Sequence, residues 1–346
     1  MPKLLSPILV VVLAVLALAL RPAEPRSLAL ELSAAFEDVA EEASPAVLQV
    51  LTYGSQGRGR RLVARGSGVI VGAEGIAVTN HHVVEPGDEV SVVLADGREL
   101  PVRLRGVDDE TDLAVLELPA GEYPTLRLVE RTPRVGAWVL AFGNPRGLGA
   151  SVTAGIVSGH GRKGLGIATF ESFLQTDATI HAGNSGGPLT DLTGSIVGIN
   201  TARGLGGEEG INFAIPADMV ADVVADILTH GRVRRGWLGV RMRVLSGRAS
   251  RIRGLEDRRH VAIREALPGG PAEAAGLREG DVILAIDGVR PTDDRDLLER
   301  VASYPPGALL ALEVLRGDEV EEIEVRLGER IAGLAREARA DEVREQ

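Results

Sequence analysis

Short apolar runs separated by glycine-containing turns dominate the chain between residues 47 and 215. Runs of apolar and β-branched residues bounded by turn residues are typical of strands. The pattern predicts nine of them, at residues 47–52, 68–71, 90–94, 113–118, 138–142, 151–158, 173–176, 195–200 and 212–215. Such a density of short strands indicates a mainly β domain and favours a double β-barrel.

Two segments flanking these strands have helical spacing instead. Residues 217–230 follow Pro216 and end at Gly231, which are common start and stop signals of a helix. Before the strands, apolar residues recur at helical intervals and predict a short amphipathic helix over 28–43, with Ser44 and Pro45 after it; these residues are Leu28, Leu32, Phe36, Val39 and Ala40.

A second, smaller domain follows, with a predicted helix at 293–304 and a strand at 309–316. We therefore expect four parts: residues 1–26 as an export segment and tether, 27–230 as the first domain, 231–330 as the second, and 331–346 as a fraying or disordered tail.

The N-terminus predicts export from the cytoplasm. Lys3 precedes an apolar stretch over 4–20, which Arg21 and Pro22 end. Its 17 residues are close to the minimum for a membrane-spanning helix. Small residues at 17–19 would suit cleavage of a signal peptide, but we favour an uncleaved anchor in the inner membrane. Either alternative places the rest of the chain outside the cytoplasm, with Lys3 on the inner side.

Charge and composition exclude some partners. The net charge of −11 and an aromatic content of 3% argue against a nucleic-acid-binding surface. Basic runs at 58–61 and 232–235 are interpreted as solvated loop or linker charges. The chain has no cysteine, so disulfides are excluded and the redox compartment stays open.

Ser185 lies in the glycine-rich segment 183–189, Gly-Asn-Ser-Gly-Gly-Pro-Leu. Such a loop could gather backbone N–H groups around one hydroxyl, as acyl transfer requires, although a plain surface turn is the alternative. A serine nucleophile needs a histidine base and an orienting carboxylate. The candidates are His82, which with His81 follows a strand-like run, and Asp112 at the entrance of an apolar strand; Asp108 and Asp109 are interpreted as solvated.

These segments resemble the HtrA/Deg family of trypsin-like serine proteases. The resemblance runs through residues 79–84, 111–116, 143–145, 175–178, 183–189, 198–201 and 210–216. It implies a chymotrypsin-like double β-barrel in which His82 is the base, Asp112 orients it and Ser185 attacks. The backbone N–H groups of Gly183 and Ser185, with Asn184 adjacent, would form the oxyanion hole. His181 stands where relatives often carry Asn and is expected to be a loop residue. No metal or organic cofactor is implied.

The second domain is similar to a PDZ domain over residues 236–329. PDZ domains bind extended peptides by strand addition and capture the terminal carboxylate with loop N–H groups. The resemblance implies a carboxylate loop formed by Trp237, Leu238, Gly239 and Val240. In the protease domain it implies a substrate pocket for small aliphatic side chains, lined by the loop 202–210 and by Ile199, Asn200 and Thr201.

One PDZ domain, an N-terminal anchor and a short loop at 54–65 look most like the stress-sensing DegS branch of the family. That resemblance implies a periplasmic homotrimer whose PDZ domain binds C-termini of misfolded proteins and thereby activates cleavage of a membrane anti-sigma factor. The loop 159–166, with Arg162 and Lys163, resembles the sensor loop of this branch. Two alternatives stay open: a broad quality-control protease, and a binding or chaperone module with an idle site.

Overall fold

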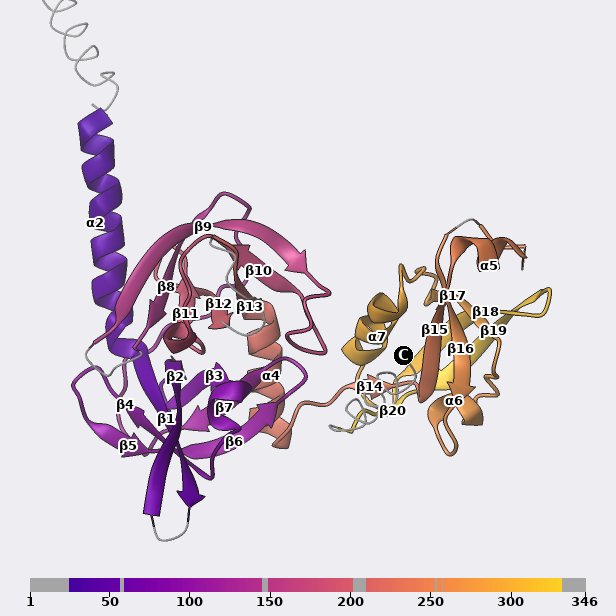
Figure 1. The fold of residues 1–346 in the computed structure, drawn as a ribbon, viewed down its shortest axis with the longest axis horizontal. Helices are drawn as coiled ribbons and strands as arrows, with labels where there is room; N and C mark the ends of the chain where they lie inside the picture. Colours follow the sequence, from indigo (N-terminus) through magenta and orange to yellow (C-terminus); the bar gives the residue numbers. More distant parts are fainter. Residues whose placement is uncertain are drawn as a thin grey trace, which may run out of the picture.

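The computed structural model describes residues 25–56, 59–144, 149–201, 210–252, 254–256 and 258–331. Figure 1 shows an N-terminal helix and two β-rich parts, joined by an extended segment after helix α4 (Ala217–His230). Of the predicted export segment and tether at 1–26, residues 1–24 lie outside the described residues, and Pro25 and Arg26 already belong to helix α2 (Pro25–Ala43). Residues 332–346 of the predicted tail at 331–346 also lie outside the described residues. Within the described residues, no helix has the length and apolar character needed to cross a membrane.

The first β-rich part combines a seven-stranded sheet with a closed barrel, which confirms the predicted fold class. The sheet contains, in spatial order, β5 (Glu99–Pro101), β4 (Glu89–Val93), β1 (Val47–Gln56), β2 (Gly59–Gly72), β3 (Ile76–Asn80), β7 (Leu113–Glu117) and β6 (Arg103–Asp108). The barrel contains β10 (Phe173–Thr176), β13 (Asn212–Pro216), β12 (Ile196–Thr201), β11 (Pro188–Thr190), β8 (Trp138–Gly143) and β9 (Ser151–Arg162).

The prediction of a short loop at 54–65 is wrong, because β1 and β2 continue as a paired hairpin as far as Gln56 and Gly59. Side chains across the ladder support this extension. The Arg60 guanidinium lies 3.6 Å from the Tyr53 ring centroid, and its Nε lies 2.9 Å from a carboxylate oxygen of Glu89. Cross-strand pairs of this kind stabilise a sheet that glycine and serine alone would not favour.

Helix α2 (Pro25–Ala43) confirms the predicted N-terminal helix and packs only by its second half. Val39 and Ala43 are buried in the main core, and Phe36 meets Trp138 edge to face with ring centroids 5.4 Å apart. By contrast, Leu28 and Leu30 near its start are 55% and 64% exposed. The apolar stripe of the helix therefore extends beyond the surface that the described residues cover.

The second β-rich part has a five-stranded sheet and its own core, centred on Ile263, Leu297 and Leu312. Its helix α7 (Asp294–Ser303) begins after Asp293, whose carboxylate accepts the Asp296 N–H at 2.8 Å. The predicted helix at 293–304 and strand at 309–316 are thus confirmed. The other elements are β14 (Gly236–Trp237), β15 (Val240–Leu245), α5 (Gly247–Ile252), β16 (His260–Ala266), α6 (Pro271–Ala274), β17 (Val282–Ile286), β18 (Leu309–Arg316), β19 (Glu319–Arg326) and β20 (Gly328–Glu329).

Candidate active site

Neighbouring strands bring His82 and Asp112 together. Strands β3 and β7 are antiparallel partners, and Asn80 at the end of β3 lies opposite Leu113 at the start of β7. The short helix α3 (His81–Val84) follows β3 directly, and Asp112 is the last residue before β7. Residues 30 positions apart in the chain therefore meet at one edge of the sheet.

The two side chains are in direct contact. Nδ1 of His82 lies 2.8 Å from Oδ2 and 3.0 Å from Oδ1 of Asp112, and the backbone N–H of His82 donates to Oδ1 at 3.0 Å. The Asp112 side chain is fully buried, whereas that of His82 is 25% exposed. A buried carboxylate with these donors fixes the orientation of an imidazole that is open to solvent on its other side.

Asp112 adopts a left-handed backbone conformation with a φ of 62°, which is uncommon for a residue other than glycine. Its carbonyl oxygen accepts the His81 N–H and the Asn80 side-chain amide, each at 3.0 Å. Thr201 Oγ1 lies 3.4 Å from its Oδ2. Backbone strain of this kind persists where several contacts enforce it, and it concentrates at functional sites.

Ser185 follows the 3-10 turn Ala182–Asn184 and is 1% exposed. Ser67 on β2 holds this loop in place: its N–H donates to the Ser185 carbonyl at 2.8 Å and its hydroxyl to the Gly183 carbonyl at 2.6 Å. The Thr79 hydroxyl in turn donates to the Ser67 carbonyl at 2.7 Å. The sequence analysis missed Ser67 and Thr79; buried hydroxyls inside apolar strands were the available signal.

Gly66 lies between the segments that carry His82 and Ser185. A Cβ atom there would stand 2.7 Å from a methyl group of Val83, the residue after His82, and 3.1 Å from the Ser185 carbonyl oxygen. Only glycine leaves room for both neighbours. The nucleophile loop and the histidine segment thus pack on the same backbone position.

The loop before Ser185 is closed by a hydrogen bond between two of its own backbone groups. The Asn184 N–H donates to the His181 carbonyl at 2.8 Å, which closes the 3-10 turn. His181 itself is exposed at the start of this turn. In this conformation the Asn184 N–H points into the loop, so the oxyanion donors to consider are those of Gly183 and Ser185.

The three residues expected to line the substrate pocket lie on β12 and are buried. Ile199 belongs to the main core, and the Asn200 side chain donates to the carbonyls of Phe142 and Pro188, each at 3.1 Å. Thr201 stands beside Asp112. The loop expected to complete the pocket lies outside the described residues at 202–209.

Asp108 and Arg235, both interpreted as solvated from the sequence, form a buried ion pair. Asp108 is 5% exposed and accepts two hydrogen bonds from Arg235, at 2.8 and 2.6 Å. Arg330 donates to Glu110, which stands two residues after Asp108. Both guanidiniums lie over the Phe170 ring, at 4.5 and 5.7 Å from its centroid. Arg235 and Arg330 flank the β14–β20 ladder, so the base of the second domain binds the turn that precedes Asp112.

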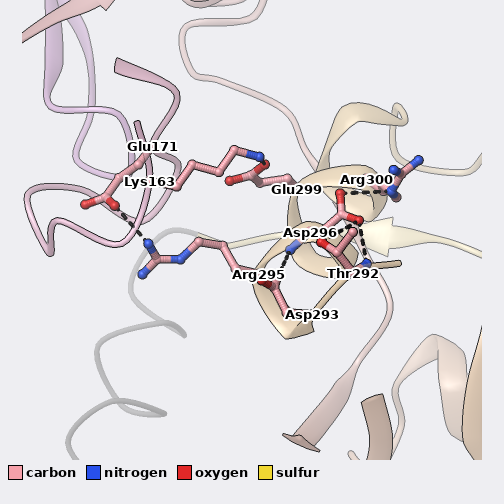
Figure 2. Close-up of polar contacts among 8 residues, drawn as sticks. All are labelled: Lys163, Glu171, Thr292, Asp293, Arg295, Asp296, Glu299 and Arg300. Atoms are coloured by element: carbon pink, nitrogen blue, oxygen red, sulfur yellow. Dashed lines mark hydrogen bonds and ion pairs between the residues drawn. The ribbon is translucent and has the colours of Figure 1, made fainter. Parts of the chain in front are cut away.

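The loop at 162–171 contacts helix α7 of the second domain (Figure 2). Arg295 donates to Glu171 at 2.9 Å, and Lys163 pairs with Glu299. Burial acts to raise the pKa of Glu171, but N–H groups of residues 165, 167 and 168 and the Arg295 charge outweigh it and lower that pKa. Arg162 donates to Gln175 on β10 at 2.8 Å. Lys163, in the predicted sensor loop at 159–166, thus contacts the second domain, whereas residues 159–162 of that predicted loop belong to strand β9.

In the second domain, Trp237 lies in the β14–β20 ladder, and the loop behind it turns at Gly239, which has a φ of 76°. The Leu238 carbonyl accepts the Ala272 N–H at 2.9 Å. Because a trans peptide directs its N–H opposite to its carbonyl, the Gly239 N–H faces away from Ala272. The loop can therefore present the Gly239 N–H beside Val240, the first residue of the edge strand β15.

Sequence comparison matches residues 66–199 to the family described as "Trypsin-like peptidase domain" and residues 236–327 to "PDZ domain". A solved structure of the "HtrA-type protease AlgW with decapeptide" is 37% identical, with a TM-score of 0.76, over 86% of this chain and 99% of that one. The chain belongs to the HtrA-type protease family. A serine endoprotease structure from Yersinia pestis is also similar, with 34% identity and a TM-score of 0.70 over 86% of this chain and 98% of that one.

Among curated HtrA-type relatives, the "Probable periplasmic serine endoprotease DegP-like" of Brucella suis biovar 1 (strain 1330) is 43% identical over 272 residues, which is 77% of this chain and 53% of the relative. The protein of the same name from Rhizobium meliloti (strain 1021) is 42% identical over 281 residues, or 80% and 55%. The chain thus spans about half the length of these curated relatives and nearly the whole length of the AlgW structure.

Proposed function

We propose that this chain is a serine endopeptidase in which Ser185 is the nucleophile, His82 the general base and Asp112 the orienting carboxylate. The observation that carries the proposal is the 2.8 Å contact between His82 Nδ1 and buried Asp112. With the Nδ1 proton directed at Asp112, Nε2 is the basic nitrogen that accepts the hydroxyl proton and later passes it to the leaving amine.

The N–H groups of Gly183 and Ser185 are the proposed oxyanion donors. One such donor contributes about 10²–10³ in kcat, because it is fixed before charge develops on the substrate oxygen. The hydrogen bonds from Ser67 to the carbonyls of Gly183 and Ser185 support this preorganisation. The proposed mechanism uses no metal or organic cofactor.

Labelling with a fluorophosphonate probe, together with casein digestion, tests the assignment. We expect labelling and cleavage in the full chain, and neither in Ser185→Ala or His82→Ala. Ser303→Ala, an exposed serine on α7, is the matched control and should behave as the parent chain. Cleavage by Ser185→Ala at the parent rate would refute the role of Ser185. Absence of labelling in the folded parent chain would instead favour the binding or chaperone module.

We further propose that residues 27–230 form the protease domain and 231–330 a PDZ domain that captures peptide C-termini with Trp237, Leu238, Gly239 and Val240. The contacts of Lys163 and Glu171 with α7 support a route by which a bound peptide changes protease activity. Addition of peptides with apolar C-termini should raise the rate of cleavage; an unchanged rate would contradict regulation by this domain. Amidated peptides of the same sequence are the control.

For the substrate, we propose a regulatory protein of the bacterial envelope, such as a membrane anti-sigma factor, cut after small aliphatic residues in a pocket near Ile199, Asn200 and Thr201. The similarity to the HtrA-type protease AlgW, whose structure is described with a decapeptide, supports recognition of a peptide by this chain. The periplasmic DegP-like relatives support the second candidate, a broad quality-control protease. Casein digestion without any activating peptide would favour the second candidate. A cleavage profile dominated by arginine would contradict the pocket.

We also propose a periplasmic location, anchorage in the inner membrane through the N-terminal segment within residues 1–26, and assembly as a homotrimer. The exposed leucines of α2 support self-association, since Leu28 and Leu30 are more than half exposed within the described residues. Analytical ultracentrifugation of a chain lacking residues 1–24 tests the assembly. Leu28→Glu with Leu30→Glu should give monomers; trimers that survive this change would place the interface elsewhere.

A further inference from the structure

Strand β15 is an edge of the five-stranded sheet, with the proposed carboxylate loop at its start and helix α5 at its far end (Figure 1). We propose that this edge selects peptides with acidic residues upstream of their terminal carboxylate, through a cationic rim of Arg243 and Arg248. The proposal rests on the PDZ function proposed above and names the chemistry of the peptide that this domain takes.

The two faces of β15 differ in character. Val240 and Met242 pack against the main core of the domain, on the side of Leu297 in α7. Arg243 lies on the opposite face, because its partner across the ladder is Ala262, a member of the separate small cluster with Leu245. A peptide added to this edge therefore meets apolar side chains at every second position and arginine between them.

Antiparallel addition to β15 fixes the order of these contacts. With the terminal residue opposite Val240, the third residue upstream faces Arg243, since opposed residues on paired strands share one face. Residues further upstream pass Leu245 and reach α5, which packs on the end of β15 through Ala249. Arg248 is exposed on that helix. The rim thus follows the path of the peptide away from its carboxylate.

Charge around this edge is strongly one-sided. Residues 241–264 contain eight arginines and two acidic residues, in a chain whose net charge is −11. Some of the arginines have carboxylate partners: Arg258 lies 3.0 Å from Glu256, and Arg241 lies 3.6 Å from Glu265. Arg243 and Arg248 form no ion pair with any residue that the structure describes. An acidic peptide supplies the missing counter-charge without displacing an existing pair.

Fluorescence anisotropy with the Ser185→Ala full chain tests the proposal without cleavage of the probe. Three short peptides share one apolar C-terminus and carry aspartate, serine or lysine at the third and fifth positions upstream. We expect the aspartate peptide to bind most tightly, by roughly 1.5- to 5-fold per charge pair over serine, and the lysine peptide most weakly. The differences in affinity among the three peptides should shrink when NaCl is raised from about 50 mM to about 500 mM, because salt screens the charge pairs.

Arg243→Glu with Arg248→Glu should reverse the order of the aspartate and lysine peptides and leave the serine peptide nearly unchanged. Arg326→Glu, an exposed arginine on β19 at the other edge of the sheet, controls for charge reversal away from the peptide path and should keep the original order. Equal affinity for all three peptides would overturn the proposal while leaving the PDZ function standing. No binding by any carboxylate-terminated peptide would refute the PDZ function itself.

An anionic membrane surface is the other class of partner that arginines could bind. Sedimentation with phosphatidylglycerol vesicles distinguishes an anionic membrane surface from an acidic peptide as the partner. Vesicle binding that Arg243→Glu with Arg248→Glu abolishes, together with equal affinity for the three peptides, would overturn the proposal in favour of a lipid surface. Discrimination among the peptides without vesicle binding supports it.

Discussion

Arg330 donates to both carboxylate oxygens of Glu110, at 2.8 and 3.1 Å, and the two side chains are only 10% and 7% exposed. Glu110 stands two residues before Asp112, and its carbonyl accepts the Phe170 N–H at 2.8 Å. Arg330 follows the last strand of the second domain. One buried ion pair thus joins the end of the PDZ domain, the loop at 162–171 and the turn that carries the proposed catalytic aspartate.

Arg330→Ala should lower the free energy of unfolding by about 3 kcal/mol, because the buried Glu110 carboxylate loses its hydrogen-bonded partner and keeps only the Arg235 guanidinium, 3.6 Å away. Burial already raises the pKa of Glu110, and Arg330 opposes that shift. Removal of Arg330 should therefore raise this pKa further, so the loss of stability should shrink at low pH, where Glu110 takes up a proton. Urea unfolding at several pH values measures both effects.

The control for Arg330→Ala is Arg326→Ala, an exposed arginine for which we expect a change below about 0.5 kcal/mol. A double variant, Arg330→Met with Glu110→Gln, should recover most of the loss, since it removes both charges together. Equal losses in Arg330→Ala and Arg326→Ala would show that the buried pair contributes nothing to stability.

Asp112→Asn should lower kcat for peptide cleavage by about ten-thousandfold and leave the protein folded. The asparagine amide can present its N–H₂ to His82 Nδ1, which favours the wrong imidazole tautomer. Asparagine also tolerates the left-handed backbone that this position requires, at a φ of 62°. The circular dichroism spectrum of the variant should match that of the parent chain, and kcat is measured on the same preparation. A folded variant with the parent kcat would contradict the orienting role of Asp112.

The sequence predicted the elements around the site better than the contacts within it. Apolar runs and glycine turns located nine of the strands β1–β13 in the described residues, and Pro216 and Gly231 gave the bounds of α4. The short strands β3, β5, β6 and β11 were not predicted, and β2 begins nine residues before its predicted start. The segment 54–65 was missed because its glycines and serine favour a loop locally. Its strand character comes from cross-strand partners such as Glu89, which local propensity cannot include.

Long-range polar contacts were the main omission. Asp108 and Arg235 each look like an ordinary surface charge in the sequence, and only the fold brings them together across 127 residues. Ser67 and Thr79 are similar cases, because the Ser67 hydroxyl holds a loop 116 residues away and the Thr79 hydroxyl in turn bonds the Ser67 carbonyl. Buried ion pairs and side-chain to backbone bonds leave little local pattern, since each partner is defined by tertiary structure.

Gly186→Ala should abolish cleavage, because an added Cβ would lie 2.2 Å from the Ser67 carbonyl and 2.4 Å from the Thr79 hydroxyl. Ser67 holds the nucleophile loop through its N–H and hydroxyl, and the Thr79 hydroxyl bonds the Ser67 carbonyl, so the loop or these residues must move. Gly97→Ala is the matched control: its φ of 86° is close to the 85° of Gly186, and nothing lies within 4 Å of the added carbon.

Both variants carry a backbone penalty of about 1–2 kcal/mol, but only Gly186→Ala should lose activity. Thermal unfolding and casein digestion of the two proteins separate the two effects. Loss of activity in Gly97→Ala as well would mean that backbone strain, and not the contact with Ser67, limits this enzyme.

Glu171→Gln should make the loop at 162–171 less stable at neutral pH, by about 2 kcal/mol, because charge-assisted bonds from three backbone N–H groups and Arg295 are weakened. The folded-state pKa of Glu171 is lowered from the ordinary value of 4.5, so its carboxylate stabilises the fold above that value and ceases to do so as pH falls through the lower one. The difference between the parent chain and the variant should therefore be largest near neutrality and vanish in acid. Amide hydrogen exchange of residues 165–168 at neutral and acidic pH measures it, with Glu313→Gln, at an exposed position of β18, as the control. A difference that grew as pH fell would contradict the lowered pKa, because it would require the protonated side chain to be the stabilising form.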